Sequence, residues 1–223
     1  MSVKNKGDFY MENNFKKQIS DDIALIKEQY SHVDSRIQND EYAFNYWVLS
    51  RLYSLDEEII PNYVTDINDK GIDCFVHYED TKELFLIQNK YYSDDTAVSR
   101  ECVSDFLYTP LRVLLAGKYS KSPELQKIFD RAITDSDYKI WLNFYVTNDY
   151  ISDDIITLIN QFSFDKSKDE RIEACIYANY SNLQDIKKIY YGERFTEKKH
   201  FSAKLPTRRA GTSLDVRPEN YDL

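Results

Sequence analysis

Cysteine is scarce in this sequence: only Cys74, Cys102 and Cys175 occur among 223 residues. They are odd in number, lie far apart and form no C-x-x-C motif. This pattern argues against a disulfide framework or a zinc cage, and a reducing cytoplasm is the expected compartment.

Long apolar runs are missing as well. The N-terminal stretch MSVKNKGDFYMENNFKK has no apolar segment of a secretion signal. No run of about 18 apolar residues occurs anywhere in the sequence. We therefore expect a protein that is neither secreted nor membrane-spanning.

An excess of positive charge is the third absence. The formal net charge is −9, which argues against a protein that coats nucleic acid with its whole surface. An enzyme acting on nucleic acid stays compatible with this charge, because a local basic patch is enough for phosphate contacts. With 42% hydrophobic and 30% charged residues, the chain has a globular composition and enough length to bury a core.

Apolar spacing divides the chain into helices and strands. Steps of three and four predict helices, whereas β-branched, aromatic or nearly continuous apolar runs predict strands. The predicted helices cover residues 11–30, 40–55, 97–116, 152–162 and 181–193, and one more begins at Ser122 and Pro123. The predicted strands cover residues 57–67, 72–78, 83–92, 138–148 and 171–180.

This order of elements predicts an α/β fold with a mixed β-sheet that carries helices on both faces. The short polar link between the second and third strands predicts an antiparallel hairpin. Asn39 or Asp40 is the expected cap of the second helix, and Ser181 of the last one. Residues 1–192 should form one domain, to which helix 11–30 is an addition, and residues 193–223 a basic arm or linker.

The stretch ELFLIQNKYY ends in polar residues, which is unusual for a strand made to be buried. Gln88 and Lys90 are two residues apart, so they share one face of the strand. The leucines at positions 84 and 86 share that face but lie deeper. Asp73 begins the neighbouring antiparallel strand, so one hairpin should bring together an acid, an amide oxygen and an ammonium group.

Such a set suits a divalent cation and a phosphate. The Asp73 carboxylate and the Gln88 carbonyl oxygen are hard ligands that fit Mg²⁺ or Mn²⁺ rather than zinc. The cation would lower the pKa of a bound water and offset charge on the phosphate. Lys90 could orient the attacking water or hold the developing negative charge. Glu41, at the start of the second helix, is the candidate for a further carboxylate ligand.

These residues resemble a known pattern. An acid at a strand start, a hydrophobic strand ending in D/E/Q-x-K and an acid on the preceding helix are similar to the PD-(D/E)XK nucleases. KGID followed by LFLIQNKYY resembles the variant with Gln at the second acidic position. That variant occurs in Mrr-like restriction nucleases and in the N-terminal nuclease-like region of abortive infection phage resistance (AIPR) proteins. EYAFNYWVL followed by TDINDKGID resembles the AIPR type most closely, and the similarity extends over residues 35–180.

The resemblance implies a restriction-endonuclease-like fold, metal-dependent hydrolysis of phosphodiester bonds and a role in phage defence. The matching positions are Glu41, Asp73, Gln88 and Lys90. Gln88 departs from the Asp or Glu of many relatives, and one anionic ligand fewer weakens the attraction for a cation. This departure puts tight metal binding in question, although Gln variants of the family include active enzymes.

Each of these residues also has a purely structural explanation. Asp73 can accept hydrogen bonds from the amides of its own turn. Lys90 can protect a sheet edge from pairing with another sheet. Glu41 can stabilise the first turn of its helix through the helix dipole.

A basic segment stands out against the acidic chain. Residues 187–209 contain eight Lys or Arg and two acids. They could bind the phosphates that flank the site, or they could be a solvated linker. The candidates for nucleic-acid contacts are Lys187, Lys188, Arg194, Lys198, Lys199, Arg208 and Arg209.

The sequence therefore predicts a cytoplasmic, metal-dependent endonuclease that acts on DNA, with RNA left open, in anti-phage defence. A homodimer would suit the cutting of two strands, although nothing in the sequence requires one. The alternative is a module that keeps the fold without the reaction and binds nucleic acid or a protein partner.

Overall fold

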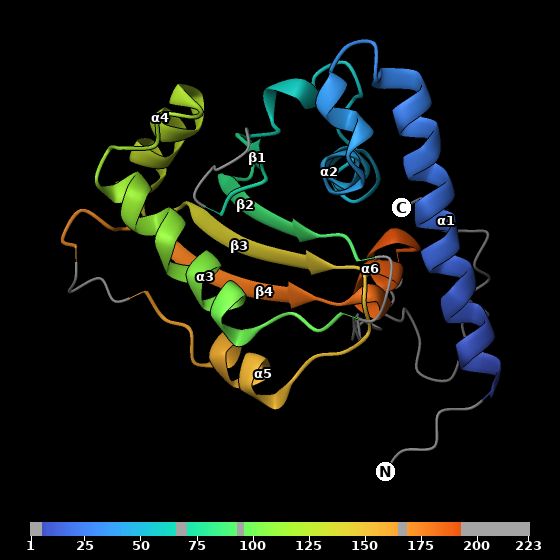
Figure 1. Cartoon of the computed structure of the whole chain (residues 1–223). Coiled ribbons are helices and arrows are strands. Elements are labelled where there is room, and N and C mark those ends of the chain that lie inside the picture. The colour runs from blue at the N-terminus through green and yellow to red at the C-terminus, as the bar shows by residue number, and fades with distance from the viewer. Residues whose placement is uncertain (1–5, 66–70, 93–95, 165–168, 193–223) are drawn as a thin grey trace, which may run out of the picture.

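The computed structural model describes residues 6–65, 71–92, 96–164 and 169–192. Its centre is a four-stranded mixed sheet with the strand order β1-β2-β3-β4 (Figure 1). The strands are β1 (Cys74–Tyr78), β2 (Glu83–Lys90), β3 (Lys139–Val146) and β4 (Cys175–Ser181). The first two form the predicted antiparallel hairpin, and β2, β3 and β4 are parallel to one another.

Helices cover both faces of this sheet, which confirms the predicted α/β class with a mixed, flanked sheet. One core lies between the sheet and α3, α4 and α5, and a second between the sheet and α1, α2 and α6. Successive side chains of β2 point to opposite faces of the sheet, so Leu86 belongs to the first core and Ile87 to the second. The helices are α1 (Lys6–Tyr30), α2 (Asp40–Arg51), α3 (Arg100–Leu115), α4 (Pro123–Ala132), α5 (Asp153–Asn160) and α6 (Leu183–Tyr190), with short 3-10 turns η1 (Ser35–Gln38) and η2 (Ile60–Asn62).

Polar caps decide where the helices begin. The Asn39 side chain accepts hydrogen bonds from two amides of the first turn, so α2 begins at Asp40 as predicted. The prediction for α6 is wrong by one residue, because its cap is Asn182. Ser181 is still the last residue of β4, where strand pairing holds its backbone.

The predicted strand over residues 57–67 is wrong. Its middle forms η2, where Pro61 fixes a turn-like backbone and offers no N–H for a strand ladder. Within the described residues of this segment, an isolated bridge between Val64 and Cys74 is the strand-like pairing that remains. The described part of the chain therefore has four strands instead of the five predicted.

The first helix is longer than predicted and begins at Lys6. Its apolar stripe packs on α2, with the ring of Phe15 6.4 Å from that of Trp47. Trp47 is fully buried, stacks on Tyr190 of α6 at 5.7 Å, and donates its indole N–H to Asp22 at 2.9 Å. These contacts join α1, α2 and α6 in the second core.

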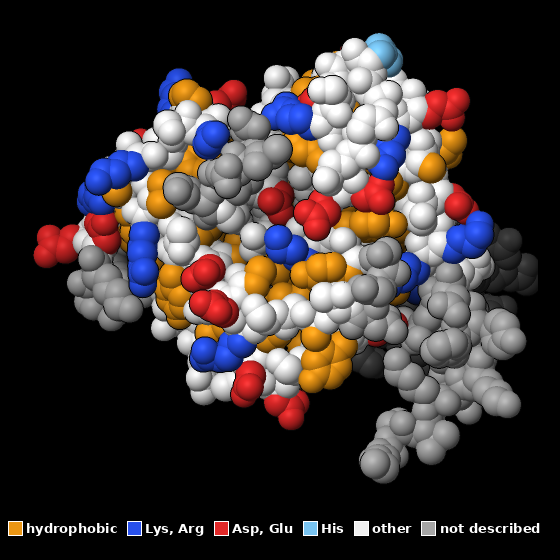
Figure 2. Space-filling view, viewed as in Figure 1, with side chains coloured by type: hydrophobic (Ala, Val, Ile, Leu, Met, Phe, Trp, Pro, Cys, Tyr) orange, Lys and Arg blue, Asp and Glu red, His pale blue; other side chains and the backbone are white. Residues whose placement is uncertain are grey.

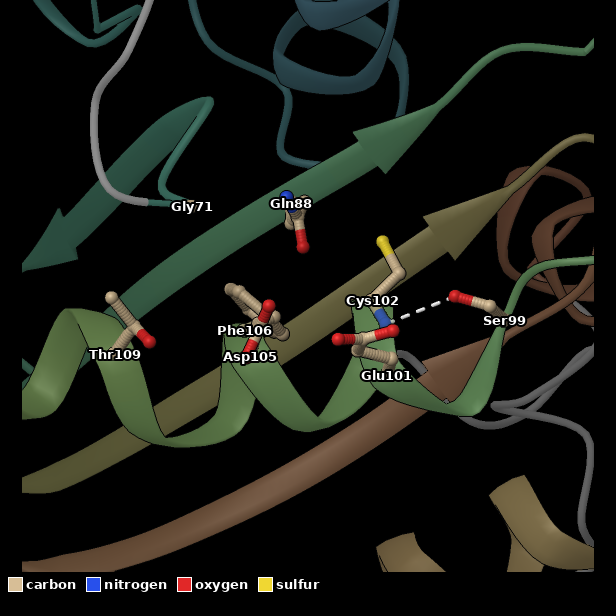
Figure 3. A pocket seen from close by; sticks show the side chains of 8 residues that line it. All are labelled: Gly71, Gln88, Ser99, Glu101, Cys102, Asp105, Phe106 and Thr109. Carbon is tan, nitrogen blue, oxygen red and sulfur yellow. Dashed lines mark hydrogen bonds between the residues drawn. The ribbon is translucent and has the colours of Figure 1, made fainter.

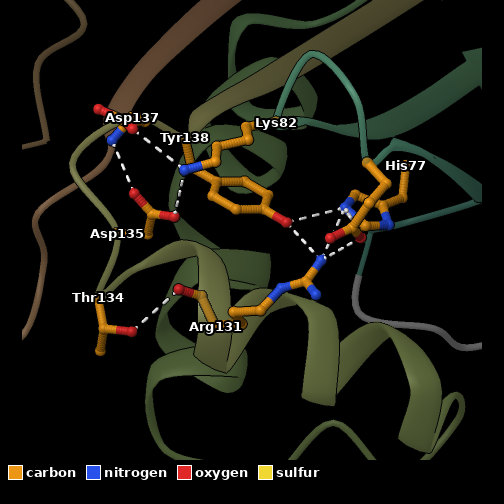
Figure 4. Close-up of polar contacts among 8 residues, drawn as sticks. His77, Lys82, Arg131, Thr134, Asp135, Asp137 and Tyr138 are labelled. Carbon is orange, nitrogen blue, oxygen red and sulfur yellow. Dashed lines mark hydrogen bonds and ion pairs between the residues drawn. The ribbon is translucent and has the colours of Figure 1, made fainter.

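Charged side chains fasten α4 to the sheet at the end where β2 and β3 begin (Figure 4). Lys82, in the turn of the hairpin, forms ion pairs with Asp135 at 2.9 Å and Asp137 at 3.1 Å. Arg131 of α4 donates hydrogen bonds to Glu79 in the same turn. The turn and the helix are thus held together by ionic contacts beside the buried core.

His77 lies within this cluster. Its Nε2 is 3.3 Å from the Arg131 guanidinium and 3.1 Å from the Tyr138 hydroxyl. The same nitrogen lies 3.6 Å from the Glu79 carboxylate. Burial lowers the pKa of His77 below its ordinary value; Glu79 and Glu124 oppose that effect, and Arg131 adds to it.

We predict that acid weakens the fold through His77. The folded pKa lies below the unfolded value of 6.5, so the stability contribution is complete above that pH and is lost as the pH falls through 6.5 toward the folded pKa. One proton limits the slope to about 1.4 kcal/mol per pH unit. Urea unfolding between about pH 7.5 and pH 5 measures this slope.

His77→Gln keeps a hydrogen-bond acceptor but cannot titrate, so its free energy of unfolding should fall less in acid than that of the wild type. His32→Gln, at an exposed histidine, is the matched control. Equal slopes in the wild type and His77→Gln would contradict a lowered pKa of His77 in the folded protein.

Candidate active site

The polar end of β2 lies on the face that α3 covers. The leucines at positions 84 and 86 are fully buried in the first core. Gln88 and Lys90 continue the same face and are only partly buried. Figure 3 shows the Gln88 side chain directed toward α3. The strand therefore leaves the core at these two residues.

Asp73 is joined to this strand end by its own carboxylate. Its Oδ2 accepts a hydrogen bond from the backbone N–H of Asn89 at 2.6 Å. Asn89 lies between Gln88 and Lys90 in the chain. The Asp73 backbone N–H donates to the Ile87 carbonyl at 2.9 Å, which fixes the residue against β2. The structure thus holds the Asp73 carboxylate at the residue that separates Gln88 from Lys90.

Gly71 permits the turn that leads to Asp73. Its φ of 92° lies in the left-handed region that other residues rarely adopt. A Cβ at this position would be 3.6 Å from Cγ of Pro110 and 3.9 Å from Nε2 of Gln88. The turn therefore packs closely between α3 and β2, and a glycine suits it for its backbone conformation.

The Gln88 amide faces a pocket of about 460 Å³ between β2 and α3 (Figure 3). Its Oε1 is buried and accepts no hydrogen bond from any described residue. Most buried side-chain acceptors in proteins do have a partner, so this oxygen is suited to a ligand. The Gln88 amide oxygen and the Asp73 carboxylate are both hard donors, of the kind that Mg²⁺ or Mn²⁺ prefers.

Two acids that line this pocket were not predicted from the sequence. Glu101 and Asp105 lie one helical turn apart on α3, are exposed, and border the same pocket as Gln88. Acids spaced by four residues, in the helix that follows the Q-x-K strand, are the sequence signal that could have indicated them. Their charge adds to the negative potential that attracts a cation.

The thiol of Cys102 lies among the charges of the site and senses several of them. Burial raises its pKa above the ordinary value, and the nearby Lys90 ammonium opposes that rise. The carboxylates of Asp105 and Asp73 raise the pKa further. Lys90 and Asp73 therefore both act on one side chain at the mouth of the pocket.

Glu41 occupies a different place from the other predicted ligands. It is exposed in the first turn of α2 and borders a second hollow of about 410 Å³, together with Tyr91. Asn45, one turn later on α2, accepts a hydrogen bond from the Asn89 side chain at 2.7 Å. Glu41 thus lies near the end of β2 but on the α2 side of it, while Gln88 faces α3.

The surface around the strand end is rich in acids. Figure 2 shows Asp and Glu side chains gathered between α2 and α3 around a Lys or Arg side chain. Within the described ranges, however, no three His, Cys, Asp or Glu side chains form a group that could hold a metal ion. A cation at this site would therefore depend on the Gln88 oxygen and on water as well as on carboxylates.

The predicted basic residues are only partly covered by the described ranges. Lys187 and Lys188 lie in the last turn of α6, and Lys188 contacts Asp185 at 3.4 Å. In Figure 1, α6 lies at the end of the sheet where the arrowheads of β2, β3 and β4 point. The other candidates, Arg194, Lys198, Lys199, Arg208 and Arg209, lie outside the described residues.

Comparison of this chain with protein-family models, with curated proteins and with solved structures gave no match. Among the helices that the structure describes, none has the length and apolar character needed to cross a membrane. The chemistry of the site has to be argued from its own residues.

Cys102 offers a direct measurement of the charges in the site. We predict that Asp73→Asn or Asp105→Asn speeds alkylation of Cys102 by iodoacetamide near neutral pH, because the pKa of the thiol falls. Lys90→Met should slow the reaction, because the pKa rises. The rates should change roughly two- to tenfold, since one pKa unit changes the thiolate fraction tenfold.

Mass spectrometry of the labelled peptides gives these rates, with the exposed Cys175 of the same sample as the reference. If Lys90→Met left the Cys102 rate unchanged relative to Cys175, Lys90 would not lie at this pocket.

Proposed function

We propose that this protein is a metal-dependent nuclease that hydrolyses phosphodiester bonds in DNA. The observation that supports the proposal is that the Asp73 carboxylate is held at the backbone of Asn89, between Lys90 and Gln88, whose buried Oε1 accepts no hydrogen bond from the described residues. The resemblance of these residues to the Gln-x-Lys nucleases supports the same reaction. It also suggests anti-phage defence as the setting.

Asp73 and Gln88 would hold Mg²⁺ or Mn²⁺ through their oxygens. A bound ion of this kind lowers the pKa of a water and offsets the charge on a phosphate. Glu41 would assist from the α2 side, and Glu101 and Asp105 from the α3 side, directly or through water. The hydrogen bond from the Asn89 backbone limits how far the Asp73 carboxylate can turn.

Lys90 supplies the positive charge of the site. Its ammonium lowers the pKa of Cys102 although Asp73 and Asp105 raise it, so it lies within electrostatic reach of the same pocket. From there it would orient the attacking water or stabilise negative charge that develops on the phosphate oxygens. Lys187 and Lys188 on α6 would contact backbone phosphates that flank the cleaved bond.

A second candidate function is a module of the same fold that binds nucleic acid or a protein partner without cutting. Two observations favour it. The amide of Gln88 is neutral, and the described residues contain no group of three acids, cysteines or histidines that could hold a metal. Such a module would need no divalent cation for binding.

We predict that Asp73→Ala and Lys90→Ala abolish cleavage. Each removes a charge that acts on the reacting phosphate, and losses of such groups cost about 10² to 10³ in rate. Plasmid DNA, single-stranded DNA and an RNA oligonucleotide should be incubated with Mg²⁺, Mn²⁺ or EDTA, and products separated on gels. Circular dichroism and urea unfolding verify that the variants are folded.

The matched controls are Asp153→Ala in the first turn of α5 and Lys118→Ala after α3, both at exposed positions. Undiminished cleavage by either site variant would end its proposed role. Absence of any cation-dependent cleavage by the wild type, combined with DNA binding in EDTA, would favour the non-cutting module.

We further predict that Gln88→Glu binds Mn²⁺ more tightly than the wild type. The added charge should strengthen binding about tenfold or more, because unit charges at close range attract by several kcal/mol near a protein surface. Gln88→Leu, of similar shape but without the oxygen, should bind more weakly. Calorimetric titration measures both, and equal affinities of all three proteins would exclude Gln88 as a ligand.

A further inference from the structure

A pair of buried amides lies directly behind the candidate site. Asn45 of α2 and Asn89 of β2 are only 6% and 5% exposed. Nδ2 of Asn89 donates to Oδ1 of Asn45 at 2.7 Å and lies 3.5 Å from the sulfur of Cys74. The pair is a polar contact between α2 and the middle residue of the Q-N-K sequence, on the face opposite to Gln88.

Both halves of the site are attached to this pair. The backbone N–H of Asn89 holds the Asp73 carboxylate at 2.6 Å, while its side chain holds α2. Glu41 is one turn before Asn45, so the two residues share a face of α2. One residue of β2 thus connects the acid from the hairpin with the helix that carries the other acid.

Stability alone does not account for the buried Asn45–Asn89 pair. Oδ1 of Asn89 is buried and accepts no hydrogen bond from the described residues. A buried amide that leaves an acceptor unsatisfied is costly, and two apolar side chains of the same shape would fill the space without that cost. What the amides add is direction, because the hydrogen bond fixes the distance and rotation of α2 relative to the strand end.

We propose that Asn45 and Asn89 are positioning residues, which fix α2, the helix that carries Glu41, relative to the Asp73 carboxylate at the end of β2. This inference rests on the proposed function. Neither amide touches the cation; each acts through the carboxylate it places. Outer residues that orient ligands commonly change metal affinity by about 10- to 100-fold when they are replaced.

The test separates positioning from stability. The double variant Asn45→Leu/Asn89→Leu removes the hydrogen bond and the unsatisfied oxygen together, so its urea midpoint should equal or exceed that of the wild type. Its affinity for Mn²⁺ in calorimetry should nevertheless fall about tenfold or more. The single variant Asn45→Asp keeps an acceptor for Asn89 and should retain affinity at least equal to that of the wild type.

Val48→Ala is the matched control, because it weakens the packing of the same helix at a fully buried position and leaves both amides of the pair in the sequence. It should lower the urea midpoint and leave Mn²⁺ affinity within about twofold of the wild type. An equal loss of affinity in Val48→Ala and the double leucine variant would reduce the effect to loosened packing and overturn the proposal.

A second readout is independent of the cation. The buried thiol of Cys74 lies against the Asn89 amide, so its alkylation reports separation of α2 from the strand. Asn45→Ala should label Cys74 several-fold faster than Asn45→Asp. If wild-type protein binds no Mn²⁺, the proposed function fails; if it binds and the double leucine variant binds equally well, the positioning inference alone fails.

Discussion

The hydrogen bond from the Asn89 backbone to the Asp73 carboxylate is the constraint on which the candidate site depends. The Asp73 carbonyl accepts from Thr65 at 2.9 Å, so this carbonyl serves the outer side of the hairpin. The Asn89 N–H, which faces the hairpin, instead donates to the side-chain oxygen of Asp73 at 2.6 Å. The hydrogen bond from the strand backbone fixes the position of the carboxylate. Hydrogen bonds to charged groups contribute about 1.5–3 kcal/mol to stability.

The replacement of a backbone carbonyl by the Asp73 side chain also explains why β1 leaves the end of β2 open. β1 begins at Cys74, so Gln88 lies beyond the last residue of β2 that pairs with β1. Its amide turns toward α3 and Gly71 rather than toward a neighbouring strand. The buried Oε1 costs free energy while it lacks a partner. On the proposed function, a cation bound here would supply the partner that this oxygen lacks among the described residues.

Local patterns predicted much of this arrangement. The two-residue period of LFLIQNK put Gln88 and Lys90 on one face, and the short link after Tyr78 indicated the hairpin that brings Asp73 beside them. The predicted strand before it was wrong, since β-branched residues around Pro61 describe burial as well as they describe a strand. The correct hairpin and the incorrect strand both depended on backbone properties of residues that are close together in the sequence.

Other parts of the site depend on how helices rotate against the sheet, which no local pattern reveals. Glu101 and Asp105 are exposed, and only the packing of α3 against the sheet places them at the edge of the pocket that Gln88 also lines. The pairing of Asn45 with Asn89 joins residues 44 positions apart, and an asparagine in a helix is no signal by itself. Glu41 illustrates the same limit: its position in the first turn of α2 was predicted, but it was also expected beside Gln88, and the two residues border different hollows.

The negative charge of the chain affects how a phosphate would approach the candidate site. Residues 187–209 carry eight basic and two acidic side chains, which is a net charge of +6. Because the whole chain has a net charge of −9, the other residues together carry −15. Acids from the hairpin, α2 and α3 surround the strand end, and Lys90 alone cannot neutralise them. This potential would repel an approaching phosphate. On the proposed function, a divalent cation held by these residues would reduce that repulsion in addition to supporting the hydrolysis.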